Sequence, residues 1–310
     1  MNSVRFIALA AIGLLGATPA TEVSKSLNST LIVAAGDIAC GARRETASGG
    51  SIDVSAVCHM SGTAALIAHL HPSAVLPLGD LQYGADDLRG FEEGYAKTWG
   101  RFRSISHPVI GNHEYDEPAA AGYFQYWGST AGPAGKGWYS YDLPGWHMIA
   151  LNGQCGGMGV GGCKKGSPQW QWLVADLRAH SRGCRLAYWH QPRFSTGPHG
   201  NNSDYTEFWS LLYAAHVDVV LNGHDHDYER FPPLNPQEKL DPNGIREFVV
   251  GTGGKNHSPF FYPSSASVTR QNTSFGVLAM TLYPHRYSWR YIAEPGATYR
   301  DWGSADCHRK

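Results

Sequence analysis

Residues 74–83, AVLPLGDLQY, join an apolar run typical of a buried strand to a glycine and then to a carboxylate, Asp80. Glycine lets the backbone turn sharply where a strand ends, so a short acidic side chain can reach the edge of a sheet. Four other apolar runs end in a similar way: 31–35 before Gly36-Asp37, 108–110 before Gly111-Asn112-His113-Glu114, 185–188 before Trp189-His190, and 217–221 before Gly223-His224-Asp225-His226. A wound sheet delivers the carboxyl ends of its strands to one edge, so we expect these polar residues to meet there.

The side chains at these strand ends are Asp, Asn, His and Tyr, which offer oxygen and nitrogen ligands suited to first-row transition metals. Asp37 and Asp80 each follow a glycine, and such an Asp is often only a turn residue. The repetition of the pattern in five segments favours a metal centre over five unrelated turns.

The histidines of these segments differ in what they can do. Asn112 offers a neutral oxygen ligand, whereas His113 beside it cannot easily share the same metal and is left to contact a substrate. His224 and His226 are two residues apart, so they point the same way if strand geometry continues through them. His190 ends another strand.

The rest of the chain alternates helical and strand patterns. We expect helices at 61–69, 91–99, 206–215 and from the N-cap Ser167 and Pro168 to about residue 181. We expect a strand at 248–250 and hairpins formed by 138–142 with 146–151 and by 275–283 with 287–292. This alternation predicts an α/β sandwich with two mixed sheets flanked by helices, as one domain over residues 21–310.

The first twenty residues have the features of a signal peptide that is cleaved during export. Arg5 precedes a short apolar stretch, and Ala17 and Ala20 offer small-residue cleavage positions. The stretch is too short to span a bilayer, although a retained N-terminal anchor is an alternative. We therefore expect a secreted or periplasmic protein. Its net charge of −1 gives no indication of a nucleic-acid partner or a membrane-binding face.

Six cysteines fit an oxidising compartment. Cys155 and Cys163 bracket a glycine-rich loop, so a local bridge is expected there. Cys40 with Cys58 would close the loop after the first strand, and Cys184 with Cys307 would tie the C-terminal tail to a central strand. Sequence alone leaves this pairing open. Metal ligation by cysteine is disfavoured because no Cys-x-x-Cys pair exists.

Taken in order, the five segments resemble the metallophosphoesterase (calcineurin-like phosphoesterase) superfamily, and specifically the compact bacterial members of its purple acid phosphatase branch. Tyr83, three residues after Asp80, and the run GHDHDYER at 223–230 carry the resemblance, which extends over residues 35–230. Two positions depart from the family pattern: Ala39 stands where glycine is usual and Ala187 where valine is usual. Both affect packing more than ligation.

The resemblance implies a role for each site residue. One metal would be held by Asp37, Tyr83 and His226, a second by Asn112, His190 and His224, and Asp80 would bridge the two. His113 would contact the phosphate and assist departure of the leaving group. His199 resembles a further substrate-contacting histidine more loosely, and it is otherwise a histidine on a loop surface.

The resemblance also implies the cofactors and the reaction. Free tyrosine has a pKa of about 10, so phenolate ligation calls for iron(III), paired with a divalent iron, zinc or manganese ion. Hydroxide activated by the two metals would attack the phosphorus of a small phosphate monoester. A phosphodiesterase or nucleotidase on the same site is the alternative activity. A phosphate-binding or signalling protein that keeps the fold without turnover is the non-enzymatic alternative.

Overall fold

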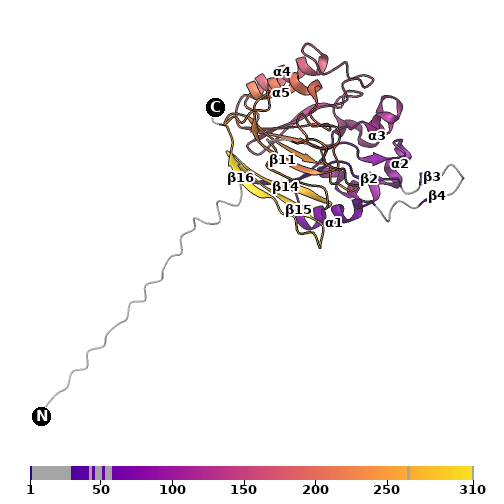
Figure 1. The fold of residues 1–310 in the computed structure, drawn as a ribbon, viewed down its shortest axis with the longest axis horizontal. Helices are drawn as coiled ribbons and strands as arrows, with labels where there is room; N and C mark the ends of the chain where they lie inside the picture. The colour runs from indigo at the N-terminus through magenta and orange to yellow at the C-terminus, as the bar shows by residue number, and fades with distance from the viewer. Residues whose placement is uncertain (2–28, 42–43, 46–50, 53–57, 264–265, 309–310) are drawn as a thin grey trace.

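The protein is described by a computed structural model in which residue 1 and residues 29–41, 44–45, 51–52, 58–263 and 266–308 are defined (Figure 1). Apart from residue 1, the expected signal sequence at 1–20 lies outside the described residues. None of the described helices has the length and apolar content that a membrane crossing requires.

Two mixed sheets form the centre of the molecule. In spatial order, the five-stranded sheet consists of β16 (Trp302–Asp306), β15 (Arg286–Ala293), β14 (Gly276–Tyr283), β1 (Thr30–Ala35) and β5 (Ala74–Pro77). The seven-stranded sheet consists of β13 (Thr269–Gln271), β11 (Tyr228–Leu234), β12 (Ile245–Val250), β10 (Val219–Asn222), β9 (Cys184–Tyr188), β8 (Trp146–Ala150) and β7 (Tyr139–Leu143). Two small sheets pair β2 (Ala39–Cys40) with β6 (Gln82–Tyr83) and β3 (Arg44–Glu45) with β4 (Ser51–Ile52).

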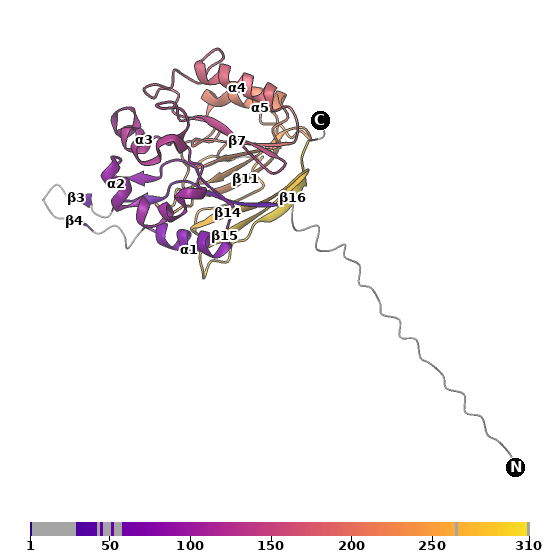
Figure 2. The ribbon, with the colours of Figure 1, turned by 180° about the vertical axis from the view of Figure 1, so that it is seen from behind.

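Helices flank the two sheets, as the sequence predicts. The α-helices are α1 (Met60–Leu70), α2 (Leu88–Glu93), α3 (Ala121–Trp127), α4 (Pro168–Ala179) and α5 (Thr206–Ala214). Short 3-10 helices occur at Tyr95–Lys97, Trp99–Ile105, His113–Asp116, Pro118–Ala120, Gly128–Ala131 and Ser203–Tyr205. Both views place α4 and α5 together on one side of the sheets and α1 on the opposite side (Figures 1 and 2).

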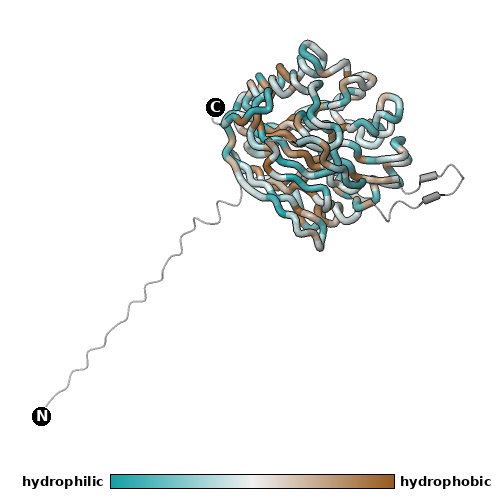
Figure 3. The backbone as a smooth tube through the Cα atoms, viewed as in Figure 1, coloured by the Kyte–Doolittle hydropathy of each residue, from teal (hydrophilic) through white to brown (hydrophobic). Residues whose placement is uncertain are grey.

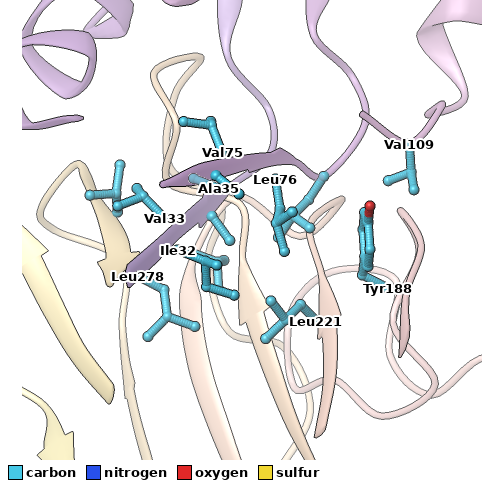
Figure 4. Close-up of a cluster of buried hydrophobic side chains, with 14 of the residues drawn as sticks. Ile32, Val33, Ala35, Val75, Leu76, Val109, Tyr188, Leu221 and Leu278 are labelled. Carbon is cyan, nitrogen blue, oxygen red and sulfur yellow. The ribbon is translucent and has the colours of Figure 1, made fainter. Parts of the chain in front are cut away.

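Alternation along the strands builds two apolar layers. On β9, Leu186 and Tyr188 belong to the cluster between the sheets, whereas Ala187 belongs to the cluster with helices α4 and α5. Figure 4 shows residues of β1, including Ile32 and Ala35, in the same buried cluster as residues of the second sheet. The hydropathy colouring is correspondingly brown along the central strands (Figure 3).

Two expected elements differ in the structure. Residues 108–110 form no strand and make a single isolated bridge, between Val109 and Leu78. The helix expected at 91–99 is broken at Gly94, where α2 gives way to a 3-10 helix. The amide of Tyr95 donates to the side chain of Gln82 at 2.9 Å instead of continuing the helix, so a tertiary contact replaces the local one.

All three expected disulfides are confirmed. Cys40 pairs with Cys58, Cys155 with Cys163, and Cys184 with Cys307, so no cysteine is free. The last bridge joins residues 123 positions apart and fixes the end of the C-terminal strand to β9.

Candidate metal centre

The ends of strands from both sheets meet where the candidate residues lie. The amide of Gly36, after β1, donates to the carbonyl of Val250 at the end of β12 at 2.9 Å. Across the same boundary, the His190 Nδ1–H donates to the carbonyl of Leu78 at 2.8 Å. The edge that the sequence predicts for one sheet is therefore shared by two sheets.

Asp37, Tyr83 and His226 form the first part of the site. The Tyr83 hydroxyl lies 2.9 Å from Asp37 Oδ1 and 3.1 Å from both Asp80 Oδ2 and His226 Nε2. His226 Nε2 is 3.3 Å from Asp37 Oδ1. Asp37 is fully buried, so its carboxylate faces these groups and not water.

Asp80, His190 and His224 form the second part. Asp80 Oδ2 lies 3.2 Å from His190 Nε2, which in turn lies 3.2 Å from His224 Nδ1. The ligand atoms of these three residues all lie within 4.8 Å of one another. Because Asp80 also contacts Tyr83, its carboxylate stands between the two parts of the site.

Asn112 is the remaining candidate donor. The amide of His113 donates to Asp80 Oδ1 at 2.9 Å. A Cβ at Gly111 would lie 2.1 Å from the same oxygen, so only glycine allows this approach. The Asn112 segment is thus held against Asp80, while the buried Asn112 Oδ1 has no hydrogen-bond partner among the described residues.

His224 and His226 do not point the same way, because the strand geometry on which that expectation depended does not continue through them. Strand β10 ends at Asn222, and His224 has a left-handed backbone with φ of 74°. The turn directs His224 to His190 and His226 to Tyr83, which places one histidine in each part of the site.

Surrounding groups orient the imidazoles. With Nδ1 of His190 bound to the Leu78 carbonyl, its Nε2 is left for the centre. His226 Nδ1 lies 3.1 Å from Asn256 Oδ1, which likewise leaves Nε2 facing Asp37.

The sequence prediction missed the part played by Glu114, although this residue belongs to the Gly-Asn-His-Glu segment. The buried Glu114 carboxylate accepts the amides of Asp80 at 3.1 Å, Leu81 at 2.6 Å and Gly111 at 2.6 Å. Glu114 therefore fastens the Asp80 turn to the turn that carries Asn112.

His113 and His199 lie beside the proposed ligands. His113 Nδ1 is 3.0 Å from Asp116 Oδ2, and its Nε2 is 3.9 Å from Asp80 Oδ2. His199 Nδ1 is 2.6 Å from the buried Asp225 Oδ1, and its ring lies 4.0 Å from that of His224. The orienting role of Asp225 was also missed, because the pattern directed attention to the histidines on either side of it.

The charges of the site are interdependent. Burial opposes ionisation of Asp80, but the nearby His190 holds the pKa of Asp80 well below its usual range. Burial also disfavours a charged His190, yet the Asp80 carboxylate raises the pKa of His190 to about 10. Burial and then the charges of Asp37 and Asp80 raise the pKa of Tyr83 well above its usual value. An ionised Tyr83 therefore requires added positive charge in the site.

The residues fit a pair of metal ions. Carboxylate, phenol and imidazole donors contact one another, with Asp37, Asp80, Tyr83 and His190 buried and the two other histidines half-buried, and such a set suits first-row metals. The unpartnered Asn112 oxygen and the facing nitrogens of His190 and His224 are what a bound cation would satisfy.

Comparisons of sequence point in the same direction. The model of the calcineurin-like phosphoesterase family matches residues 30–228. Purple acid phosphatase 21 of Arabidopsis thaliana is 33% identical over 168 residues, which cover 49% of this chain and 36% of that protein. Fe(3+)-Zn(2+) purple acid phosphatase 12 of the same plant is 30% identical over 269 residues, covering 74% of this chain and 55% of that protein. The matches thus span only about a third to a half of these relatives.

Solved structures share the fold. Purple acid phosphatase PPD1 from yellow lupin (Lupinus luteus) seeds superposes with a TM-score of 0.66 at 19% identity, covering 89% of this chain and 53% of that chain. GAP50, the anchor in the inner membrane complex of Plasmodium, gives the same TM-score of 0.66 at 14% identity, covering 91% of this chain and 90% of that chain.

Proposed function

The chain belongs to the calcineurin-like phosphoesterase family, in its purple acid phosphatase-like branch, and from that premise we propose that it is a secreted two-metal phosphomonoesterase. The observation that carries the proposal is a set of seven candidate donors: six have donor atoms in contact with at least one other member, and Asn112 has a buried Oδ1 with no hydrogen-bond partner among the described residues. The seven are Asp37, Asp80, Tyr83, Asn112, His190, His224 and His226.

The donors divide into two sets. Asp37, Tyr83 and His226 would hold a trivalent iron, because a phenol whose pKa is raised by burial ionises only beside a strongly acidic metal. Asn112, His190 and His224 would hold a divalent iron, zinc or manganese ion. Asp80, which contacts groups of both sets, would bridge the two ions. The printed metal content of the Arabidopsis relative, Fe(3+) and Zn(2+), supports a pair of this kind.

The cations, when bound, supply positive charge that polarises the phosphoryl group and activates water. Two histidines then position the ester. Asp116 holds His113 by its Nδ1, so the Nε2 is directed toward Asp80 and is free to donate to the departing oxygen. Asp225 holds His199 in the same manner beside His224, where the His199 Nε2 is a second donor to phosphate.

The three disulfides support secretion. Three disulfides among six cysteines are typical of proteins that mature in an oxidising compartment. The signal sequence expected at 1–20 would deliver the protein to that compartment. Detection of the mature protein outside the cytoplasm, beginning after Ala20, tests this part of the proposal.

Parallel assays of a phosphate monoester and a phosphate diester test the activity, with a metal-depleted sample as control. We expect hydrolysis of the monoester that is lost on metal depletion and restored by iron with a divalent metal. Preferential hydrolysis of the diester would replace the proposal by the phosphodiesterase alternative. A fully metal-loaded protein that hydrolyses neither ester would leave the binding or signalling alternative.

Tyr83 tests the identity of the trivalent metal. Phenolate ligation of iron(III) produces a charge-transfer band, so the concentrated protein is expected to be pink to purple. Tyr83→Phe keeps the ring but removes the donor oxygen, and the colour should disappear. A colourless wild-type protein that is active and contains oxidised iron at full occupancy would remove the case for a purple-type centre.

A further inference from the structure

Residues 255–263, here called the rim segment, begin against the proposed metal ligands. The amide of Lys255 donates to the carbonyl of Asp37 at 3.0 Å. The Asn256 side chain contacts the His226 imidazole at 3.1 Å, and the amide of Ser258 donates to the carbonyl of His226 at 3.0 Å. The first half of the rim segment therefore has a fixed position beside the metal centre.

The second half crosses to the side of the site that carries His199. The amides of Phe261 and Tyr262 both donate to the carbonyl of Thr196, at 2.9 and 3.1 Å. The Tyr262 ring packs against Gly200, where a Cβ would lie 3.0 Å from it. Gly200 directly follows His199, whose ring is 4.0 Å from that of His224. The rim segment thus connects the two sides of the metal centre.

Two aromatic rings of the rim segment are left in solvent. Phe261 is 65% exposed and Tyr262 is 51% exposed. Among the exposed large hydrophobic residues in the described part of the chain, only these two are adjacent in sequence. Their neighbour Phe260 differs, because the guanidinium of Arg270 lies over its ring at 4.5 Å. Adjacent exposed aromatic rings on an anchored segment beside a candidate active site are positioned to bind an apolar ligand group.

The charge of the rim segment lies at its other end. Lys255 Nζ is 4.8 Å from the centre of the Tyr83 ring, and it lines the same cavity of about 920 Å³ as His113. A ligand that follows this rim would meet cationic groups at one end and flat apolar rings at the other.

We propose that Phe261 and Tyr262 form a subsite that stacks on a planar aromatic leaving group of the phosphate ester, such as a nucleobase or an aryl ring. This inference rests on the proposed phosphoesterase function and specifies its substrate class. Stacking on aromatic side chains is tolerant of the identity of the ring, so the subsite selects planar leaving groups over aliphatic ones.

Adenosine 5′-monophosphate and ribose 5-phosphate provide the test. The two esters share the same scissile bond and the same departing hydroxyl, and they differ in the base. For the wild-type protein we expect kcat/KM to be about tenfold higher for the nucleotide, since stacking of one base supports a preference of this order. Phe261→Ala and Tyr262→Ala should each lower the ratio of the two kcat/KM values about fivefold, whereas Tyr262→Phe, which keeps the ring, should preserve it.

Trp302→Ala is the matched control, because this residue is 76% exposed and lies on the edge strand β16. It should leave the ratio unchanged. Phenyl phosphate distinguishes the two kinds of ring. If the alanine variants lose kcat/KM for both phenyl phosphate and the nucleotide, the subsite accepts aromatic rings in general. If they lose kcat/KM for the nucleotide alone, the subsite is one for nucleobases. A wild-type ratio near one, or a ratio unaffected by the double alanine variant, would overturn the inference.

Calorimetric binding of adenosine to the metal-loaded protein separates this inference from the proposed function. Adenosine carries the ring without the phosphate, so its binding requires no turnover. If the protein hydrolyses no ester but binds adenosine, and Phe261→Ala abolishes that binding, the phosphatase proposal is refuted and the subsite is supported. Hydrolysis without adenosine binding would refute the subsite alone.

Discussion

His147 of β8 is the residue whose replacement gives the clearest test of the electrostatics of this fold away from the metal centre. Its ring is buried with 3% of the side chain exposed, and it joins the β7–β8 hairpin to helix α4. His147 Nδ1 lies 2.7 Å from Asp142 Oδ1, and His147 Nε2 lies 2.8 Å from Asp176 Oδ2. Carboxylate oxygens only accept, so these two contacts favour the protonated imidazole, in which both ring nitrogens donate.

The magnitude follows from these two contacts. The Asp142 side chain is 66% exposed, so its pair with His147 contributes at most ~1 kcal/mol. Asp176 is buried, and after the loss of the ring it would keep the hydroxyl of Ser140 at 2.7 Å and His180 Nδ1 at 3.4 Å. Removing one partner of a buried pair costs roughly 3–5 kcal/mol. His147→Gln can still donate to Asp176, so we expect the free energy of unfolding to fall by about 2–3 kcal/mol in acid solution.

The pH dependence has a defined sign. Burial favours the neutral ring, but the hydrogen bonds to Asp176 and Asp142 outweigh it and raise the pKa of His147. The stabilisation is therefore fully present below the unfolded pKa of about 6.5 and is lost as pH rises through the folded value. The difference between wild type and His147→Gln should shrink from about pH 5 to about pH 9.

Urea unfolding followed by circular dichroism at both pH values measures this difference. His69→Gln is the matched control, since His69 is an exposed histidine on helix α1. It should change the free energy of unfolding little at either pH. A loss for His147→Gln that is equal at both pH values, or larger in alkali, would refute the charged-imidazole reasoning.

Three further changes test other parts of the argument. His113→Ala should lower turnover ~10²–10⁴-fold with metal content unchanged, and less for esters with good leaving groups; loss of a metal would instead make His113 a ligand. Asp80→Asn should abolish activity and weaken retention of both metals, since an amide bridges two cations poorly; near-normal activity with both metals bound would contradict the bridging role. In the chain-entropy description, removal of Cys184–Cys307, whose cysteines are 123 positions apart, should lower the free energy of unfolding by about 5 kcal/mol. Removal of Cys155–Cys163, with a separation of 8, should lower it by about 2.5 kcal/mol. Melting temperatures of the two double-serine variants test that order, and thiol titration of the unreduced protein should find no free thiol.

Much of the site could be predicted from the sequence because its chemistry is local. A ligand-type side chain stands within a few residues of the end of each apolar run, with a glycine before it in most of them, so the candidate donors can be read from their position along the chain. The same holds for helix α4, whose N-cap Ser167 accepts the amide of Trp170 as expected. The glycine-rich loop between Cys155 and Cys163 likewise predicted the disulfide between these two residues.

The tertiary structure decided what depends on residues far apart in sequence. Asp37 Oδ1 and His226 Nε2 are 3.3 Å apart although 189 positions separate the two residues in the sequence, because the ends of two sheets meet there. The different partners of His224 and His226 depend on a left-handed backbone at His224 that no periodicity predicts.

The rim segment also has features that the sequence predicts and features that only the tertiary structure determines. Its aromatic residues are visible in the sequence as FFY at 260–262, but an exposed ring and a core ring have the same composition. Only the hydrogen bonds from this segment to His226 and Thr196 show that its backbone lies beside the candidate metal centre. Residue types and their order along the chain thus define the donors, whereas packing between distant segments determines which donors meet and what surrounds them.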